Sequence, residues 1–152
     1  MAVDVNLVKK LREETGAGIA DCKNALTESD GDMAKAKDIL HQKGLDKAGS
    51  KSDREVSAGV VEAYSHGGRV GVLVELLCET DFVAKTEDFK TLAHELVLQV
   101  AAMNPENEEE LLDQEYVRDP SQKVGDLIKT AIAKLGENIK IGKFSRITLG
   151  AK

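Results

Sequence analysis

Residues 70–85 read Val-Gly-Val-Leu-Val-Glu-Leu-Leu-Cys-Glu-Thr-Asp-Phe-Val-Ala-Lys. The apolar, β-branched part of this segment, which ends at Cys78, is typical of a strand. In the stretch that follows, residues 86–103, apolar side chains recur at helical spacing. Residues 79–85 are therefore predicted to form a strand-to-helix junction. Junctions of this kind lie at the surface between rigid elements and often carry functional residues.

The junction has two interpretations on residue type and position. In the first, Phe82 folds back into the core, as most aromatic side chains do, and Asp81 or Thr86 caps the helix. In the second, Asp81 and Phe82 project outward and bind a partner. The residues alone leave both interpretations open.

The rest of the sheet is predicted from the same kind of pattern. Residues 56–65 and 70–78 form two strands, and the turn at 66–69 contains two glycines, which supply the positive φ angles that tight hairpins need. A third strand is predicted over 139–149. Its alternation of apolar and polar residues shifts at Gly142, which indicates a β-bulge there.

Two helices are predicted to cover this sheet. The helix over 86–103 has a broad apolar stripe, and a second helix is expected from a cap at Ser121 to Gly136. The acidic stretch 106–119 between them is expected to be a solvated connector. The core, residues 56–149, is therefore expected to be β-β-α-α-β, with helices on one face of a three-stranded antiparallel sheet.

The N-terminal part predicts three short amphipathic helices. Asp4 and Asp32 are expected to cap the first and the third, while Gly16 ends the first and Gly44 the third. The turn at residues 15–18 contains two glycines, which let the chain reverse and also let another protein approach the backbone closely. This turn does not match the phosphate-binding motif GxxxxGK[ST].

The sequence therefore predicts an α+β protein with a division into modules. Residues 1–45 form a three-helix bundle, residues 46–55 a polar linker that lets the bundle move, and residues 56–149 the core, followed by a tail at 150–152.

Composition and charge indicate the class of partner. The 152-residue chain has a formal net charge of −6, 3% aromatic residues and no Trp. A nucleic-acid binder needs basic residues for phosphates and often aromatic side chains for unpaired bases, so we expect a protein partner and no direct nucleic-acid contact. No apolar stretch approaches the roughly 20 residues that span a bilayer, and the chain does not begin like a signal peptide, so we expect a cytoplasmic location and no membrane contact.

No catalytic or metal-binding pattern is found. The histidines His41, His66 and His94 are far apart, and His94 begins an HExxH-like stretch that lacks its second histidine. The cysteines Cys22 and Cys78 have no CxxC spacing, so neither a disulfide framework nor a zinc site is indicated. Cys78 would be a nucleophile only if His66 or His94 lay beside it in space. We expect no cofactor, no metal and no enzymatic reaction.

Three motifs carry a resemblance to a known family. Residues 80–85, Thr-Asp-Phe-Val-Ala-Lys, resemble the signature of the elongation factor Ts family, the guanine-nucleotide exchange factors of elongation factor Tu. Residues 11–26 resemble the N-terminal motif of that family, and residues 136–139, Gly-Glu-Asn-Ile, resemble a third motif. The similarity covers nearly the whole chain and favours the interpretation in which Phe82 projects.

The resemblance implies a translation elongation factor that binds elongation factor Tu in its GDP-bound and nucleotide-free forms and promotes GDP release without covalent chemistry. It implies a bundle like a ubiquitin-associated (UBA) domain, which contacts the nucleotide-binding domain of elongation factor Tu through Arg12, Gly16, Ala17, Gly18, Ile19 and Lys23. It also implies that a second set of residues displaces Mg²⁺ from elongation factor Tu, namely Thr80, Asp81, Phe82 and Val83. In this set Phe82 is the apolar wedge.

Long bacterial relatives contain two core subdomains, whereas this chain has a single core unit. We therefore expect two chains to pair as a homodimer through the core. The competing hypothesis for function is a non-catalytic adaptor, in which the UBA-like bundle captures a globular partner and the core is a scaffold.

Overall fold

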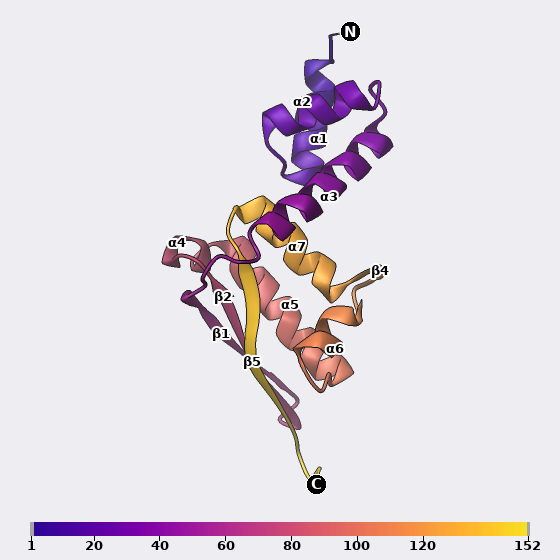
Figure 1. The fold of residues 1–152 in the computed structure, drawn as a ribbon. Helices are drawn as coiled ribbons and strands as arrows, with labels where there is room; N and C mark the ends of the chain where they lie inside the picture. Colours follow the sequence, from indigo (N-terminus) through magenta and orange to yellow (C-terminus); the bar gives the residue numbers. More distant parts are fainter. Residues whose placement is uncertain (1, 152) are drawn as a thin grey trace.

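The computed structural model describes residues 2–151. Three helices come first: α1 (Val5–Thr15), α2 (Ile19–Glu28) and α3 (Met33–Ser50). They are followed, in chain order, by β1 (Ala58–His66), β2 (Val70–Cys78), α4 (Asp81–Ala84), α5 (Glu87–Met103), α6 (Glu108–Asp113), β3 (Glu115–Tyr116), β4 (Asp119–Lys123), α7 (Val124–Leu135) and β5 (Ile139–Thr148). Figure 1 shows the small bundle of α1 to α3 at one end and the long sheet, with helices along it, in the rest of the molecule. The predicted α+β class is confirmed.

The caps of the N-terminal helices are those that the sequence predicts. Asp4 Oδ1 accepts a hydrogen bond from the N–H of Asn6 at 2.8 Å, and Asp32 Oδ1 accepts one from the N–H of Lys35 at 3.1 Å. Gly16 ends α1 with a φ of 72°, which glycine adopts without strain. The three helices enclose a small core made of Leu11, Cys22, Ala25, Leu26 and Ala36.

The predicted end of the third helix at Gly44 is wrong, because α3 continues to Ser50. A side chain at Gly44 would meet the Cβ of Ala133 at 3.2 Å, so the missing side chain lets α3 lie close against α7. Farther along α3, Ala48 is buried in the main core. This packing outweighs the weak helix propensity of glycine. The first half of the expected mobile linker is thus helical and packed, while the division into modules remains a prediction.

The sheet is antiparallel throughout, in the order β1-β2-β5. The hairpin between β1 and β2 turns at Gly67 and Gly68, both with positive φ, as predicted. Alternate residues of β2 face the helices and are buried, from Val72 to Cys78. Opposite Glu75, β5 holds Gly142 and the residue after it, and the register shifts there. The predicted bulge at Gly142 is therefore confirmed.

Helices cover one face of this sheet. Helix α5 lies across β1 and β2, and α7 lies against α5, β5 and α3. Thr86 caps α5, with its Oγ1 accepting a hydrogen bond from the N–H of Phe89 at 3.2 Å. The core between sheet and helices contains fully buried side chains from each layer, among them Val74, Leu76, Phe89, Leu96, Val97, Val100 and Val124.

The acidic stretch 106–119 is not the solvated connector that we expected, because it forms α6 and β3. Two apolar side chains anchor it: Leu111 is fully buried and Tyr116 is 8% exposed. Tyr116 Oη donates a hydrogen bond to Glu95 Oε2 at 2.6 Å. The expected cap at Ser121 is also wrong. Ser121 lies in β4, where its N–H and hydroxyl both donate to Asp119 Oδ1, and α7 begins only after β4.

Within residues 2–151, no helix combines the length and the apolar character needed to cross a membrane.

We predict that Gly59→Ala strongly destabilises the fold. Gly59 has a φ of 149°, and a Cβ at this position would overlap the backbone oxygen of Leu76 on the neighbouring strand. We expect a loss of about 3 kcal/mol in the free energy of unfolding, measured by urea denaturation. Gly67→Ala is the matched control, because Gly67 also has a positive φ of 59° but has open space around it. A loss of about 1–2 kcal/mol is expected there. Equal losses in the two variants would contradict the close approach at Gly59.

We also predict that stability falls in alkali because of Tyr116. Burial, together with the hydrogen bond to the carboxylate of Glu95, raises the pKa of Tyr116 from 10.0 to about 12. The folded state therefore favours the protonated phenol, so its contribution is complete below pH 10.0 and is lost as the pH rises toward about 12. A shift of this size corresponds to at most about 3 kcal/mol. Denaturant unfolding at a series of pH values should show a steeper decline for wild type than for Tyr116→Phe. If the stability of the two proteins fell in parallel with pH, the assigned role of Tyr116 would be contradicted.

Candidate functional site

The strand-to-helix junction forms a single helical turn, α4, between β2 and α5. Thr80 caps this turn, because the N–H of Val83 donates to Thr80 Oγ1 at 3.4 Å. Thr80 also donates from its own hydroxyl to Glu137 Oε2 at 2.7 Å, and from its N–H to Glu137 Oε1 at 3.0 Å. The start of the turn is thus attached to the loop between α7 and β5.

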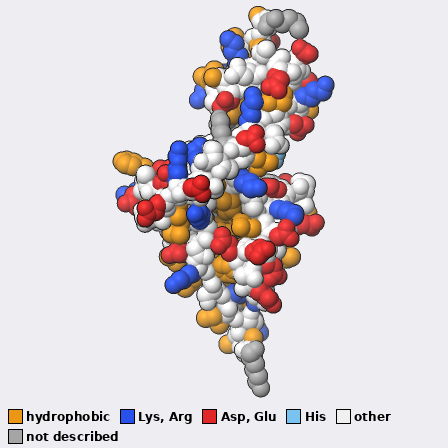
Figure 2. Space-filling view, in the orientation of Figure 1, with side chains coloured by type: hydrophobic (Ala, Val, Ile, Leu, Met, Phe, Trp, Pro, Cys, Tyr) orange, Lys and Arg blue, Asp and Glu red, His pale blue; other side chains and the backbone are white. Residues whose placement is uncertain are grey.

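The side chain of Phe82 projects from this turn and is 88% exposed. The next two residues, Val83 and Ala84, are 9% and 4% exposed and belong to the main core. The interpretation in which Phe82 folds back into the core is therefore wrong. Figure 2 shows apolar atoms protruding at the corner of the molecule where Figure 1 places α4.

The four residues predicted to act on elongation factor Tu have different environments. Asp81 and Phe82 are exposed and free to contact another protein. Val83 is buried and anchors the turn. Thr80 is exposed, but its hydrogen bonds hold the backbone of the turn. The structure thus divides the set into a projecting pair and a supporting pair.

Cys78 lies under the turn and is buried. Its Sγ donates a hydrogen bond to the backbone oxygen of Thr80 at 3.2 Å. Burial raises the pKa of this thiol, and the nearby carboxylates of Glu137 and Asp81 raise it further. The nearest partner of His66 is Tyr64, with Oη and Nδ1 2.8 Å apart. His66 thus pairs with Tyr64 of its own strand, and Cys78 with a backbone oxygen.

The N-terminal residues predicted to bind a partner gather around the turn between α1 and α2. Arg12, Ile19 and Lys23 are exposed, Ile19 by 59%. Gly16 lies near Lys134 of α7, because a side chain at Gly16 would meet Lys134 Cε at 3.2 Å. The stretch Gly16 to Gly18 lines a crevice of about 410 Å³ whose opposite wall is α7. The glycines therefore let α7 of the same chain lie close to this turn, in addition to any approach by another protein.

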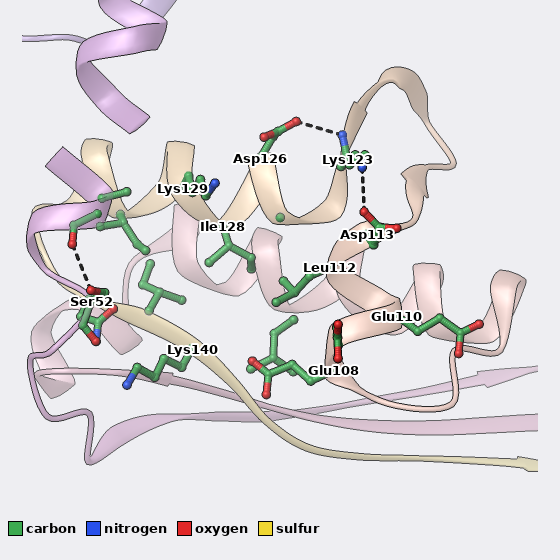
Figure 3. Close-up of a pocket in the computed structure, with 18 of the residues that line it drawn as sticks. Ser52, Glu108, Glu110, Leu112, Asp113, Lys123, Asp126, Ile128, Lys129 and Lys140 are labelled. Atoms are coloured by element: carbon green, nitrogen blue, oxygen red, sulfur yellow. Dashed lines mark hydrogen bonds and ion pairs between the residues drawn. The ribbon is translucent and has the colours of Figure 1, made fainter. Parts of the chain in front are cut away.

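A hollow of about 1010 Å³ lies between α6, α7, β5 and the end of α3. Figure 3 shows Leu112 and Ile128 lining it, with Lys123 at the rim bonded to Asp113. Among the described residues, those predicted to contact elongation factor Tu lie elsewhere. The hollow is therefore separate from the candidate site.

Residue-by-residue reasoning did not include Glu137 among the site residues. Its two hydrogen bonds to Thr80 cross a separation of 57 residues in the sequence. The only signal for it in the sequence was its place in the motif at residues 136–139, which resembles a family motif without indicating a role.

Comparisons with known proteins agree with the motifs. A family model described as "Elongation factor TS" matches residues 79–152. The chain is similar to the elongation factor Ts of Desulfosudis oleivorans, with 41% identity over 194 aligned positions, covering 97% of this chain and 98% of that protein. The elongation factor Ts of Caldanaerobacter subterraneus subsp. tengcongensis is 44% identical over 194 positions, covering 97% of each chain. The elongation factor Ts of Herpetosiphon aurantiacus is 44% identical over 197 positions, covering 99% of this chain and 100% of that protein.

These alignments are longer than the 152 residues of this chain, so the relatives contain further residues that it lacks. The matched parts nevertheless include both the bundle and the core. With 41 to 44% identity along almost its entire length, the chain belongs to the elongation factor Ts family of translation elongation factors.

Proposed function

We propose that this elongation factor is a guanine-nucleotide exchange factor for elongation factor Tu. It binds elongation factor Tu loaded with GDP, promotes release of GDP, and holds the nucleotide-free form until GTP binds. The observation that carries the proposal is the 88% exposure of Phe82 on a turn whose neighbouring residues are buried or hydrogen-bonded. Aromatic side chains are enriched in the buried centres of protein interfaces, so a phenyl ring held in water by a fixed turn is suited to insertion into a partner.

The mechanism is a difference in affinity between two states of the partner. Mg²⁺ offsets the negative charge of the phosphates and so helps to hold GDP. A factor that binds the empty form more tightly than the loaded form must weaken nucleotide binding by the same ratio. Burial of a phenyl side chain in the empty form contributes about 1.5–3 kcal/mol. That energy corresponds to about ten- to a hundredfold in a binding constant.

The residues of the turn have separate parts in this mechanism. Phe82 enters the partner beside its Mg²⁺ site, and Asp81 makes polar contacts that hold the displaced partner backbone. Thr80 and Val83 keep the shape of the turn from within this chain. No covalent bond is made or broken, so the protein acts as an exchange factor and not as an enzyme.

The bundle supplies a second contact, with the nucleotide-binding domain of elongation factor Tu. Ile19 is 59% exposed and provides its apolar centre, with Arg12 and Lys23 as charged neighbours. Because α3 packs on α7, this contact and Phe82 are presented by one continuous body. Such a partner places the protein in the cytoplasm, where translation takes place.

The core also has an apolar surface that we assign to a second copy of this chain. On the sheet face opposite the helices, the exposed fractions of Val61, Leu73 and Ile147 are 66%, 51% and 71%. Small residues lie among them, with Ala63 and Ser145 paired to Leu73 on either side. Glu75 lies opposite Val61 on this face, and away from it the mixture of large and small uncharged side chains can pack against a copy of itself. Two sheets stack face to face at about 10 Å, which gives a symmetric homodimer.

We predict that Phe82→Ala slows GDP release by about tenfold or more, because the wedge is lost while the turn is kept. Stopped-flow fluorescence of a labelled GDP leaving elongation factor Tu measures this rate. Since Phe82 is exposed, the free energy of unfolding should change by less than about 0.5 kcal/mol. Met103→Ala is the control, because Met103 is 47% exposed at the far end of α5. Unchanged release with Phe82→Ala would remove Phe82 from the mechanism.

Two further measurements in the same assay separate the alternatives. Asp81→Asn keeps the shape of the side chain and removes its charge, so wild-type release rates would show that the charge is not needed. An adaptor would bind the GDP-loaded and nucleotide-free forms of elongation factor Tu with equal affinity, whereas an exchange factor binds the empty form more tightly.

We predict that Ile147→Glu prevents pairing of two chains, because it places a charge on the apolar sheet face. Light scattering should give twice the chain mass of 16.4 kDa for wild type and a single chain for the variant. Val117→Glu is the control, since Val117 is 42% exposed in the turn between the antiparallel strands β3 and β4. A wild-type monomer at micromolar concentration would overturn the assignment.

A further inference from the structure

Two distant segments, 79–80 and 137–138, are joined by reciprocal hydrogen bonds beneath the Phe82 turn. Glu137 accepts two bonds from Thr80, at 3.0 Å from the N–H and 2.7 Å from the hydroxyl. In the opposite direction, Glu79 Oε2 accepts a bond from the N–H of Asn138 at 2.7 Å. Each segment thus supplies one carboxylate and receives the other.

A third segment is tied to the same place. Asn138 is 2% exposed, and its Nδ2 donates to the backbone oxygens of Arg54 at 2.7 Å and Ser52 at 3.4 Å. Arg54 Nη1 lies 3.6 Å from Glu79 Oε2. The chain that leaves α3 is therefore attached to the loop that follows α7. Asn138 thus holds the loop after α7 to the rest of the chain, whereas the neighbouring Glu137 bonds to Thr80.

The contacts of Thr80 account for all its polar groups. Its N–H donates to Glu137, and its oxygen accepts from Cys78 Sγ at 3.2 Å and from the N–H of Ala84 at 3.2 Å. Its hydroxyl donates to Glu137 and accepts from the N–H of Val83. A hydroxyl that donates in one direction and accepts in another has its rotamer fixed. Glu137 therefore fixes the residue from which α4 begins.

We propose that Glu137 is a positioning residue for exchange: it holds Thr80 so that α4 presents Phe82 in its working orientation before the partner arrives. This inference deepens the proposed function and rests on it. Hydrogen bonds to a carboxylate are shorter and stronger than neutral ones. A turn ordered in advance avoids the entropy loss of ordering on binding. Glu137 itself touches only its own chain and acts through Phe82.

The expected signature distinguishes this role from that of Phe82. Without Glu137 the turn must be ordered in every complex with the partner, so more factor is needed for half-maximal GDP release. The rate at saturation is kept, because the phenyl ring is still present. Phe82→Ala should have the opposite pattern, with a lower rate at saturation.

The experiment compares Glu137→Ala with Glu137→Gln in the full chain. The alanine variant loses both bonds to Thr80. The glutamine variant retains an oxygen that accepts from the Thr80 N–H and an NH₂ that donates to the hydroxyl, so it should be partly rescued. We expect the factor concentration for half-maximal GDP release to rise about tenfold for alanine and less for glutamine. Glu110→Ala in α6 is the control, because it removes a carboxylate that accepts a hydrogen bond from the N–H of Glu106.

A second readout needs no partner. In the free protein, hydrogen exchange of the Thr80 and Val83 amides should be about tenfold faster in Glu137→Ala than in wild type. The free energy of unfolding should change little. Adding Glu137→Ala to Phe82→Ala should lower exchange activity much less than Glu137→Ala does in the wild-type chain, because Asp81 is then the projecting residue of the turn that remains. Unchanged amide exchange, or an equal effect of Glu137→Ala with and without Phe82, would overturn the inference. If Phe82→Ala alone has wild-type activity, the proposed function fails, and the amide exchange still decides whether Glu137 orders the turn.

Discussion

Burial of Val83 and Ala84 determines the direction of Phe82, and with it the function that we propose. Adjacent side chains in a helical turn are separated by about 100° around the axis. The two residues after Phe82 occupy the core beside β2 and α5, so the phenyl ring must face water. The exposure of this aromatic side chain is therefore a consequence of the packing of the two residues next to it.

The position of the bundle depends on a second packing arrangement, between α3 and α7. Gly44 lets the two helices approach, and Ala48 continues the contact into the main core. Near the C-terminal end of α7, Lys134 lies beside Gly16, and its Nζ pairs with Asp88 Oδ2 at 3.4 Å. The two regions proposed to touch elongation factor Tu are consequently held by the same helix. A partner that fits both at once gains from this fixed arrangement.

Local patterns predicted most of the fold, and long-range contacts account for what they missed. The strand over 70–78 and the bulge at Gly142 were correct because alternation of side chains reports burial directly. Helix α3 was predicted too short, since its last turns are stabilised by α7, far away in the sequence. The acidic stretch was misjudged because Tyr116 and its neighbours give no periodic signal. For the same reason a single turn could not reveal which side Phe82 faces, and the role of Glu137 depends on a residue 57 positions away.

The structure of this protein bound to nucleotide-free elongation factor Tu tests the central claim most directly. The account predicts that the ring of Phe82, 88% exposed in the free chain, is buried inside the GTPase next to its empty Mg²⁺ site. It also predicts that the turn keeps its bonds to Glu137. A complex in which that ring remains in water, or lies against its own chain and far from the nucleotide site, would contradict the account.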